Sequence, residues 1–272
     1  MVFTKESSIF GVMSTYNHLL IEHPHQHVAQ LLLNRPEAAN ALNTQMATEL
    51  QQFFSKLPPQ QTRVVILSGA GRHFCAGADL KERKGMNEND WKTQHKAFRD
   101  ARDAILYCSL PVIAAVNGAA YGGGLELALA CDFIYAAETA NFALTEATLG
   151  IMPGMGGTQT LPRAAGNRRA KELLFAGKRF SATEAFEWGI VNKLYEANLL
   201  LEKTIACADS IANSAPLSVQ AIKRSVNDGA QLPLSDALEL ELALYNKLLS
   251  TDDRKEGINA YNDKRKPDFS GG

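Results

Sequence analysis

The sequence lacks any apolar stretch long enough to cross a lipid bilayer, and its first twenty residues lack the charged start and apolar run of a secretory signal. It is also poor in cysteine: Cys75, Cys108, Cys131 and Cys207 lie far apart and form no C-x-x-C pair, which argues against a zinc site or a thioredoxin-like motif. We therefore expect a cytoplasmic protein with reduced thiols, no metal site and no membrane partner.

The chain has almost no net charge, with a formal value of -1 at pH 7. Such a chain has no overall attraction to nucleic acid or to an anionic membrane, so we expect no specific nucleic-acid partner. We interpret the basic clusters at residues 81–84 and 264–266 as solvated, with binding of a coenzyme phosphate as a second hypothesis. His23, His25 and His27 alternate around Pro24, which indicates a solvated turn rather than a metal face.

Motifs of several common enzyme classes are absent. The chain has no G-x-S-x-G elbow, no G-x-x-x-x-G-K-[ST] loop, no H-E-x-x-H pair and no G-x-G-x-x-G after a strand. Esterase, nucleotidase and dehydrogenase functions therefore lose support.

What the chain does have is a composition of 46% hydrophobic and 21% charged residues over 272 positions, enough for a substantial core. Strand-like and helix-like segments alternate through the first two thirds, which predicts an α/β fold. The predicted strands are residues 18–22, 28–34, 63–68, 111–118 and 132–137, with a Pro-containing turn between the first two. The predicted helices are residues 44–54, 89–108 and 125–131.

Beyond residue 199 the apolar residues are spaced three and four apart, which predicts a separate helical section. We therefore divide the chain into a core, residues 1–198, and a C-terminal helical section, residues 199–272. No Gly/Ser linker separates them, so we expect the two sections to pack together.

Three glycines, Gly122 to Gly124, follow a buried strand and lead directly into a helix. The first amides of a helix have no partner inside it, and glycine lets a ligand approach the backbone closely. The helix dipole adds partial positive charge where negative charge would develop on a thioester oxygen. The segment can supply half of an oxyanion hole, and a turn that only permits tight packing explains it equally well.

The segment FCAGADLKER at residues 74–83 offers a second amide, because small residues again leave backbone exposed before a predicted helix. Ala78 is the candidate donor. Taken alone this signal is weak, since Asp79 could simply cap the following helix.

Two glutamates stand in apolar or glycine-rich surroundings. Glu126 lies among leucines, where an ionised carboxylate is costly to bury, and Glu146 lies in NFALTEATLGIMPGMGG. Two carboxylates that meet in one site suit general acid and base catalysis, because their repulsion separates their proton affinities. A first-turn carboxylate favoured by the helix dipole and a surface glutamate are the plain alternatives.

Four segments in order along the chain resemble the crotonase, or enoyl-CoA hydratase/isomerase, superfamily: LNRPEAANAL, FCAGADLKER, PVIAAVNGAAYGGGLELALACD and IMPGMGGTQTLPR. The resemblance implies a spiral of ββα turns with a C-terminal helical oligomerisation section, and a homohexamer built as a dimer of trimers. It also implies an acyl-CoA substrate, with coenzyme A as part of the substrate and no separate cofactor, in fatty acid metabolism.

By position, the resemblance assigns Ala78 and Gly123 to the oxyanion-hole amides, and Glu126 and Glu146 to the paired glutamates of hydratases. Further positions match residues that line the coenzyme and acyl pocket in relatives: Ala38, Ala41, Ala76, Asp79, Leu80, Gly122, Gly154 and Lys264. Residues that depart from those common in hydratases leave the coenzyme contacts and acyl preference open; they are Glu37, Thr145 and Tyr261.

The paired glutamates favour an enoyl-CoA hydratase, which adds water across the 2,3 double bond of a 2-enoyl thioester to give a 3-hydroxyacyl thioester. FCAGADLKER and GGGLELALACD are especially similar to methylglutaconyl-CoA hydratases. Two alternatives stay open: a Δ3-Δ2-enoyl-CoA isomerase, in which Glu146 shuttles the proton, and a non-catalytic acyl-CoA or RNA-binding relative.

Overall fold

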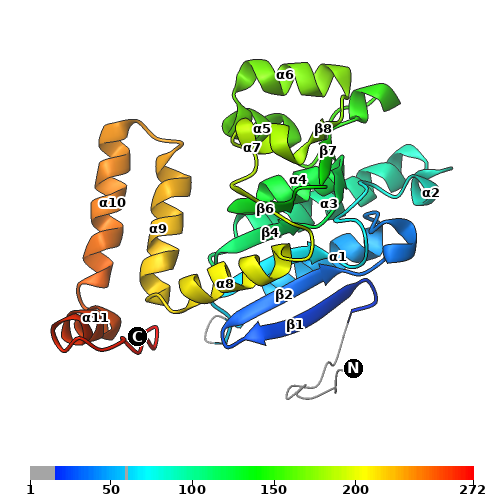
Figure 1. The fold of residues 1–272 in the computed structure, drawn as a ribbon. Helices are drawn as coiled ribbons and strands as arrows, with labels where there is room; N and C mark the ends of the chain where they lie inside the picture. Colours follow the sequence, from blue (N-terminus) through cyan, green and yellow to red (C-terminus); the bar gives the residue numbers. More distant parts are fainter. Residues whose placement is uncertain (1–15, 59–60) are drawn as a thin grey trace, which may run out of the picture.

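The computed structural model describes residues 16–58 and 61–272, and its centre is a six-stranded sheet (Figure 1). The strands follow the order β1-β2-β3-β4-β6-β9, and all neighbours are parallel except β1 and β2. They are β1 (Leu19–His25), β2 (Val28–Leu33), β3 (Val64–Gly69), β4 (Val112–Val116), β6 (Phe133–Ala137) and β9 (Lys193–Tyr195). Every residue of β3 and β4 is buried, as their continuous apolar sequences predict.

The turn between the first two strands differs from the prediction. Pro24 lies inside β1, and Gln26 and His27 form the turn, with His27 at φ 65°. Proline is tolerated here because β1 is an edge strand, and its pairing with β2 shifts register between Glu22 and His25.

Two helices that begin at asparagine caps pack against one another. These are α1 (Thr44–Ser55), whose amide of Met46 donates to Asn43, and α3 (Glu88–Leu106), capped by Asn87. Between them lies the short α2 (Leu80–Arg83), which begins at Asp79. The predicted helices 44–54 and 89–108 are confirmed to within two residues at each end.

A smaller three-stranded sheet, ordered β5-β7-β8, stands beside the large one. Its strands are β5 (Ala119–Tyr121), β7 (Asn141–Ala143) and β8 (Phe180–Ser181). Around it lie α4 (Gly123–Ala130), α5 (Gly157–Ala165), α6 (Asn167–Ala176), α7 (Ala182–Glu187) and two 3-10 turns, η1 (Pro36–Ala38) and η2 (Glu146–Leu149). The glycine-rich segment leads from strand β5 of this sheet directly into the buried helix α4.

The C-terminal residues are helical, as predicted. They form α8 (Leu200–Ala212), α9 (Pro216–Gly229), α10 (Leu234–Leu248) and α11 (Asp252–Asn262). Helix α8 packs on β3 and β4, whereas α9, α10 and α11 extend away from the sheet (Figure 1). Because α8 packs on the sheet, the packing continues across residue 199. The division of the chain into two domains at that residue stays a prediction.

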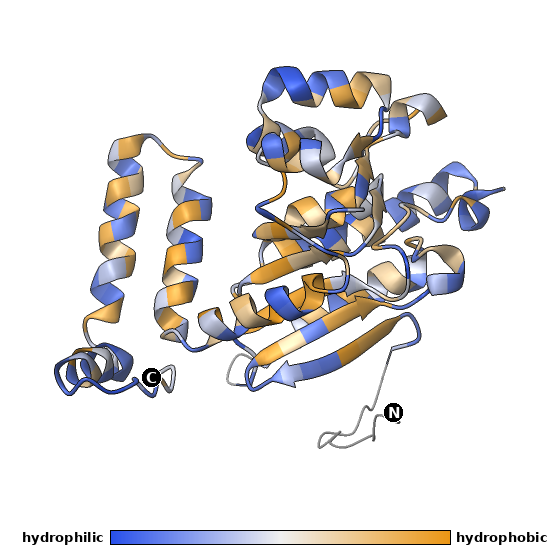
Figure 2. Cartoon of the chain, in the orientation of Figure 1, coloured by the Kyte–Doolittle hydropathy of each residue, from blue (hydrophilic) through white to orange (hydrophobic). Residues whose placement is uncertain are grey.

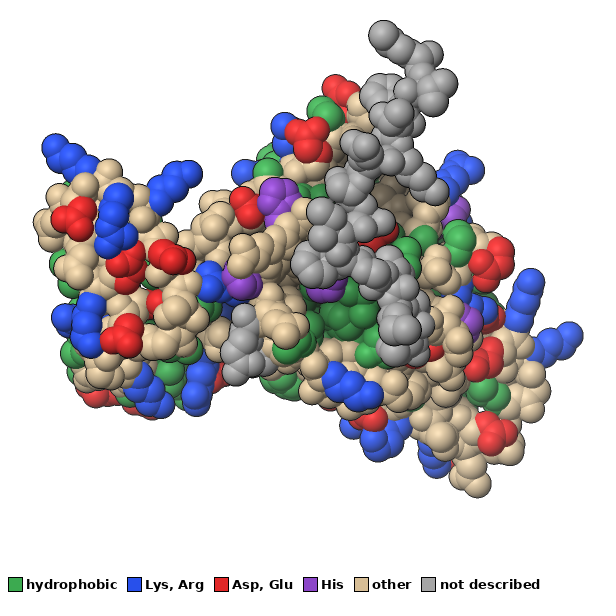
Figure 3. All heavy atoms as spheres, turned by 90° about the horizontal axis from the view of Figure 1, so that it is seen from below, with side chains coloured by type: hydrophobic (Ala, Val, Ile, Leu, Met, Phe, Trp, Pro, Cys, Tyr) green, Lys and Arg blue, Asp and Glu red, His purple; other side chains and the backbone are tan. Residues whose placement is uncertain are grey.

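Two polar links tie the extending helices to the core. Lys223 of α9 forms an ion pair of 2.8 Å with Asp132, and Arg63 donates to the carbonyl groups of Ala212 and Phe269. Helices α9 and α10 nevertheless keep hydrophobic side chains exposed. Figure 2 shows hydrophobic residues recurring along both helices. Acidic and basic side chains are interspersed on the same section in the view of Figure 3. Within the described residues, no helix is long and apolar enough to span a bilayer.

Candidate active site

A cavity of about 670 Å³ opens between α2, α3, the start of α4 and the segment around η2. Six of the residues proposed from the sequence as site or pocket residues line it together with both glutamates. These six are Ala76, Ala78, Leu80, Gly122, Gly123 and Gly154. The structure thus brings together segments that are up to eighty residues apart in the chain.

Two backbone amides without a hydrogen-bond partner among the described residues lie close together in the lining of the cavity. A parallel bridge joins Leu42 to Ala78 through the amides of Leu42 and Asp79, so the amide of Ala78 keeps no partner among the described residues. Gly123 is the first residue of α4, and the first bond within this turn is donated by Glu126 to the carbonyl of Gly122. A Cβ built on Gly123 would lie 3.9 Å from the Ala78 nitrogen, so the two residues are neighbours, as the two donors of one oxyanion hole have to be.

Glycine is required at two positions of this arrangement. Gly77 has φ 96°, and a Cβ there would lie 2.8 Å from the carbonyl oxygen of Tyr121. Gly122 has φ 49°, and its Cβ would lie 3.0 Å from Oε1 of Glu146. Both are left-handed conformations that disfavour side chains. The glycines therefore hold the two backbone segments close together beside a glutamate.

Glu126 is buried on α4, with 2% of its surface exposed. Its Oε1 accepts hydrogen bonds from the backbone amides of Met155, at 2.7 Å, and Gly157, at 2.8 Å. Burial, with a smaller contribution from the charge of Glu146, raises the pKa of Glu126 to about 7, although the two backbone amides that donate to it act in the opposite direction. The carboxyl can therefore gain or lose a proton near neutral pH.

Glu146 begins η2 and is also buried, with 9% of its surface exposed. Burial raises its pKa, while its own backbone amide and the charge of Arg83 lower it. Its Oε2 is buried without a hydrogen-bond partner among the described residues. A buried carboxylate oxygen without a partner is costly for stability, which fits an atom kept for a ligand.

Two carboxyl groups with raised pKa values in one cavity titrate as a pair. Because like charges repel, ionising one of the two carboxyl groups makes the other harder to ionise, so one can hold a proton while the other is ionised. Such a pair can give a proton to one atom of a substrate and take one from another. The two free amides next to it can stabilise a developing oxyanion.

Four residues proposed from the sequence do not line this cavity. Asp79 caps α2 and forms an ion pair with Arg35 at 3.0 Å, so its side chain has the capping role weighed from the sequence. Ala38 and Ala41 are half-buried in the segment that leads to Leu42. Lys264 is exposed just after α11. A role for these four in binding coenzyme A stays a prediction.

The cavity has a further wall that the sequence did not reveal. Helices α2 and α3 supply Arg83, Trp91, His95, Phe98 and Arg99, and the segment after η2 supplies apolar residues. The interpretation of residues 81–84 as solvated is wrong for Arg83, which is half-buried in this wall. The residues next to Arg83 in the sequence are polar or exposed, so no helical pattern of apolar residues indicated that Arg83 faces the cavity.

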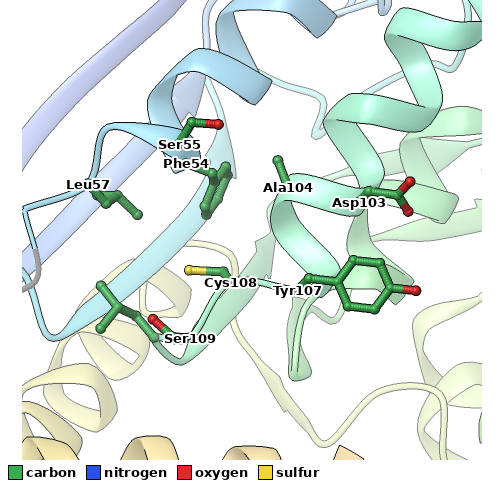
Figure 4. A pocket seen from close by; sticks show the side chains of 9 residues that line it. Phe54, Ser55, Leu57, Asp103, Ala104, Tyr107, Cys108 and Ser109 are labelled. Carbon is green, nitrogen blue, oxygen red and sulfur yellow. The ribbon is translucent and has the colours of Figure 1, made fainter.

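A second hollow, of about 300 Å³, lies between the ends of α1 and α3 (Figure 4). Two reactive side chains line this hollow: Asp103, which is ion-paired with Arg102, and Cys108, whose pKa is raised by burial. Neither group is activated for chemistry. Among residues 16–58 and 61–272, no three histidine, cysteine or acidic side chains cluster as metal ligands.

The comparison with known families agrees with this geometry. Residues 23–272 match the sequence model of the family described as enoyl-CoA hydratase/isomerase. The chain belongs to this family, the crotonase superfamily, and the predicted α/β crotonase fold is confirmed.

Individual relatives cover nearly the whole chain. The enoyl-CoA isomerase/hydratase fer4 of Mycosarcoma maydis is 41% identical over 254 residues, which are 90% of this chain and 93% of that protein. A probable mitochondrial enoyl-CoA hydratase 2 of Arabidopsis thaliana is 41% identical over 246 residues, covering 90% and 82%. The crystal structure of an enoyl-CoA hydratase from Bacillus anthracis superposes with a TM-score of 0.93 at 44% identity, covering 94% of this chain and all of that one.

Proposed function

We propose that the chain is an enoyl-CoA hydratase that adds water reversibly across the 2,3 double bond of a 2-enoyl-CoA thioester. The observation that carries the proposal is the meeting of Glu126 and Glu146 in one cavity beside the free amides of Ala78 and Gly123. Within the family, relatives carry both hydratase and isomerase names, so the geometry of this pair decides our choice.

In the proposed reaction the amides of Ala78 and Gly123 donate to the thioester oxygen and stabilise the enolate that forms there. Glu126, poised by its pKa of about 7, accepts a proton from a water whose oxygen bonds to Cβ. Glu146 gives its proton to Cα, and the carbon-carbon double bond becomes a single bond. One proton has left the water and one has reached Cα, so the 3-hydroxyacyl thioester forms without any change in oxidation state overall.

The test is hydration of crotonyl-CoA, followed as loss of the conjugated enoyl-thioester absorbance. We expect Glu126→Gln and Glu146→Gln each to lower kcat by about 100-fold or more, because general acid-base catalysis contributes about that factor. Glu187→Gln, an exposed glutamate on α7, is the matched control and should keep full activity. Full turnover in both site variants would refute the mechanism.

A second candidate is a Δ3-Δ2-enoyl-CoA isomerase, favoured by the unpartnered Oε2 of Glu146, which alone could carry a proton between two carbons. A 3-enoyl-CoA substrate separates the two. An isomerase forms the conjugated thioester from it and leaves Glu126→Gln active, and it incorporates no oxygen from labelled water into the product. A non-catalytic acyl-CoA-binding relative would bind the thioester and turn over neither substrate.

We also propose a homohexamer, a dimer of trimers, because α9 to α11 expose many apolar side chains that a monomer would leave in water. The exposed apolar residues of these helices include Ile222, Val226, Leu234, Leu238, Leu242, Tyr245 and Ile258. Light scattering during size-exclusion chromatography gives the mass directly, and a monomeric mass would refute this assembly.

A further inference from the structure

The carboxyl of Glu126 is held by a segment of irregular backbone that joins η2 to α5. Its Oε1 accepts hydrogen bonds from the amides of Met155 and Gly157 at the end of this segment. The carbonyl oxygen of Gly154 lies 2.9 Å from Nε2 of His95 on α3, and it has no other hydrogen-bond donor among the described residues. Because a carbonyl oxygen only accepts, Nε2 carries the proton of this bond. His95 is thus the donor that ties the segment to α3.

Gly154 and Met155 share one peptide group, and this group links His95 to Glu126. Its carbonyl accepts from the imidazole, and its N–H donates to the carboxylate at 2.7 Å. The peptide is trans, so its oxygen and its N–H point in opposite directions, toward α3 and α4. A hydrogen bond to the carbonyl also polarises the N–H of the same conjugated group and strengthens it as a donor, by about 10–30%. The imidazole therefore orients this amide and makes it a better donor to Glu126.

The close approach of α3 to the segment depends on glycine. A Cβ built on Gly154 would lie 2.5 Å from Nε2 of His95. About two turns further along α3, on the same helix face, Arg102 approaches the neighbouring turn, since a Cβ built on Gly156 would lie 3.0 Å from its Nη1. One face of α3 thus approaches the segment at two points next to the carboxyl.

We propose that His95 is a positioning residue for Glu126, and that it acts by holding the carbonyl of Gly154 so that the amide of Met155 is aimed at the carboxylate. The inference rests on the proposed function, in which Glu126 must be ionised to accept a proton from the attacking water. Without the imidazole donor, the amide is weaker and free to turn away. The carboxylate then loses stabilisation relative to the carboxylic acid.

The electrostatics of the cavity set the direction of the effect. Burial is the main cause of the raised pKa of Glu126, and the amide of Met155 is one of the groups that oppose it. Weakening this amide should therefore raise the pKa further. The charged side chains that line the cavity or interact with Glu126 are Arg83, Arg99, Arg102 and Glu146. A substitution of His95 leaves all four in place.

Three variants break or keep this hydrogen bond, and crotonyl-CoA is the substrate for each. His95→Phe keeps a ring but removes the donor, and Gly154→Ala keeps the imidazole but forces it away from the carbonyl. His95→Gln places an amide nitrogen at nearly the same reach and so retains a neutral donor. His23→Phe, the same change at an exposed histidine of β1, is the matched control.

Two measurements are made on each variant. Values of kcat and KM are determined between about pH 5 and about pH 9, where the carboxyl pair titrates. Infrared pH-difference spectra follow the protonated carboxyl of Glu126 without any substrate, and the band is assigned by its loss in Glu126→Gln. The second measurement needs no turnover, so it separates this inference from the proposed function.

We expect His95→Phe and Gly154→Ala to raise the midpoint of the Glu126 band by about 0.5–1 pH unit, the size of one lost hydrogen bond. In His95→Phe the acidic limb of kcat should move the same way, with kcat at neutral pH about 2- to 5-fold lower and KM little changed. His95→Gln and His23→Phe should keep the wild-type midpoint. An unchanged midpoint in His95→Phe, an effect confined to KM, or an equal shift in His95→Gln would overturn the inference. A shifted band in a protein that hydrates no enoyl thioester would keep the inference and refute the hydratase.

Discussion

Replacing Glu126 by glutamine should make the protein more stable at alkaline pH while abolishing catalysis. The carboxyl is 2% exposed, and ionising it in this position is costly because it loses its hydration. Glutamine keeps an oxygen that can accept the amides of Met155 and Gly157 but never ionises. The substitution therefore removes the desolvation cost and retains the local structure.

The magnitude follows from the pKa. The usual value is 4.5 and the folded value is about 7, and a tenfold change in an equilibrium is worth about 1.4 kcal/mol, so the difference amounts to roughly 3 kcal/mol. Because the pKa of Glu126 is higher in the folded than in the unfolded protein, its protonated carboxyl contributes this roughly 3 kcal/mol to folding stability below about pH 4.5. The contribution is lost as the pH rises through about 7. Wild type loses it over that range, whereas Glu126→Gln does not.

Urea unfolding at fixed protein concentration, at about pH 4.5 and at about pH 8, measures the effect. We expect the free energy of unfolding of Glu126→Gln, relative to wild type, to rise by up to about 3 kcal/mol between the two pH values. Glu187→Gln, from the exposed face of α7, should follow wild type at both. Parallel pH dependence of wild type and Glu126→Gln would refute the claim that this carboxyl is buried with a raised pKa.

Three further substitutions test the framework of the site. Gly122→Ala places a Cβ 3.0 Å from Oε1 of Glu146 at φ 49°, so crotonyl-CoA turnover should fall at least 10-fold, with about 1–3 kcal/mol of strain; an active, equally stable variant would contradict this. Asn40→Ala removes the buried side-chain amide that donates to the carbonyl oxygens of Ala70 and His73, and should lower the free energy of unfolding by about 2–4 kcal/mol; a loss below 1 kcal/mol would speak against it. Asp79→Asn keeps the helix cap but breaks the ion pair with Arg35, and should lower the free energy of unfolding by about 1–2 kcal/mol at neutral pH. Although desolvation opposes them, the hydrogen bonds from Arg35 and from backbone amides lower the pKa of Asp79 below 3.8. The difference in unfolding free energy between wild type and variant should therefore shrink only as the pH falls below 3.8.

The strands and long helices were predictable because local signals agree with the fold. Strands β3 and β4 are continuous apolar runs with β-branched residues, and Asn43 and Asn87 mark the starts of α1 and α3. The short strands of the second sheet were missed, because β5, β7 and β8 have only two or three residues each and carry no period. Their pairing is decided by tertiary contacts.

The site divides in the same way. Gly122 and Gly123 could be found because a run of glycines before a helix is a local signal, and Gly122 holds the positive φ of the turn into α4. Arg83 could not, because its inward position depends on how α2 packs against Gln94 and Trp91 of α3. The same holds for the bonds to Glu126, whose donors follow it by 29 and 31 residues.

Several residues of the cavity are ones that stability alone would not select. Glu126 is buried with a raised pKa, Oε2 of Glu146 lacks a partner among the described residues, Gly122 is held at positive φ, and Arg83 forms no ion pair with an acid of residues 16–58 or 61–272. Each feature costs free energy, and a chain that needed only to fold would lose it by single substitutions. All four meet in one cavity beside two free amides, and a ligand whose developing oxyanion lies at those amides would account for Glu126, Glu146 and Gly122 there. The site is thus best explained by what it binds.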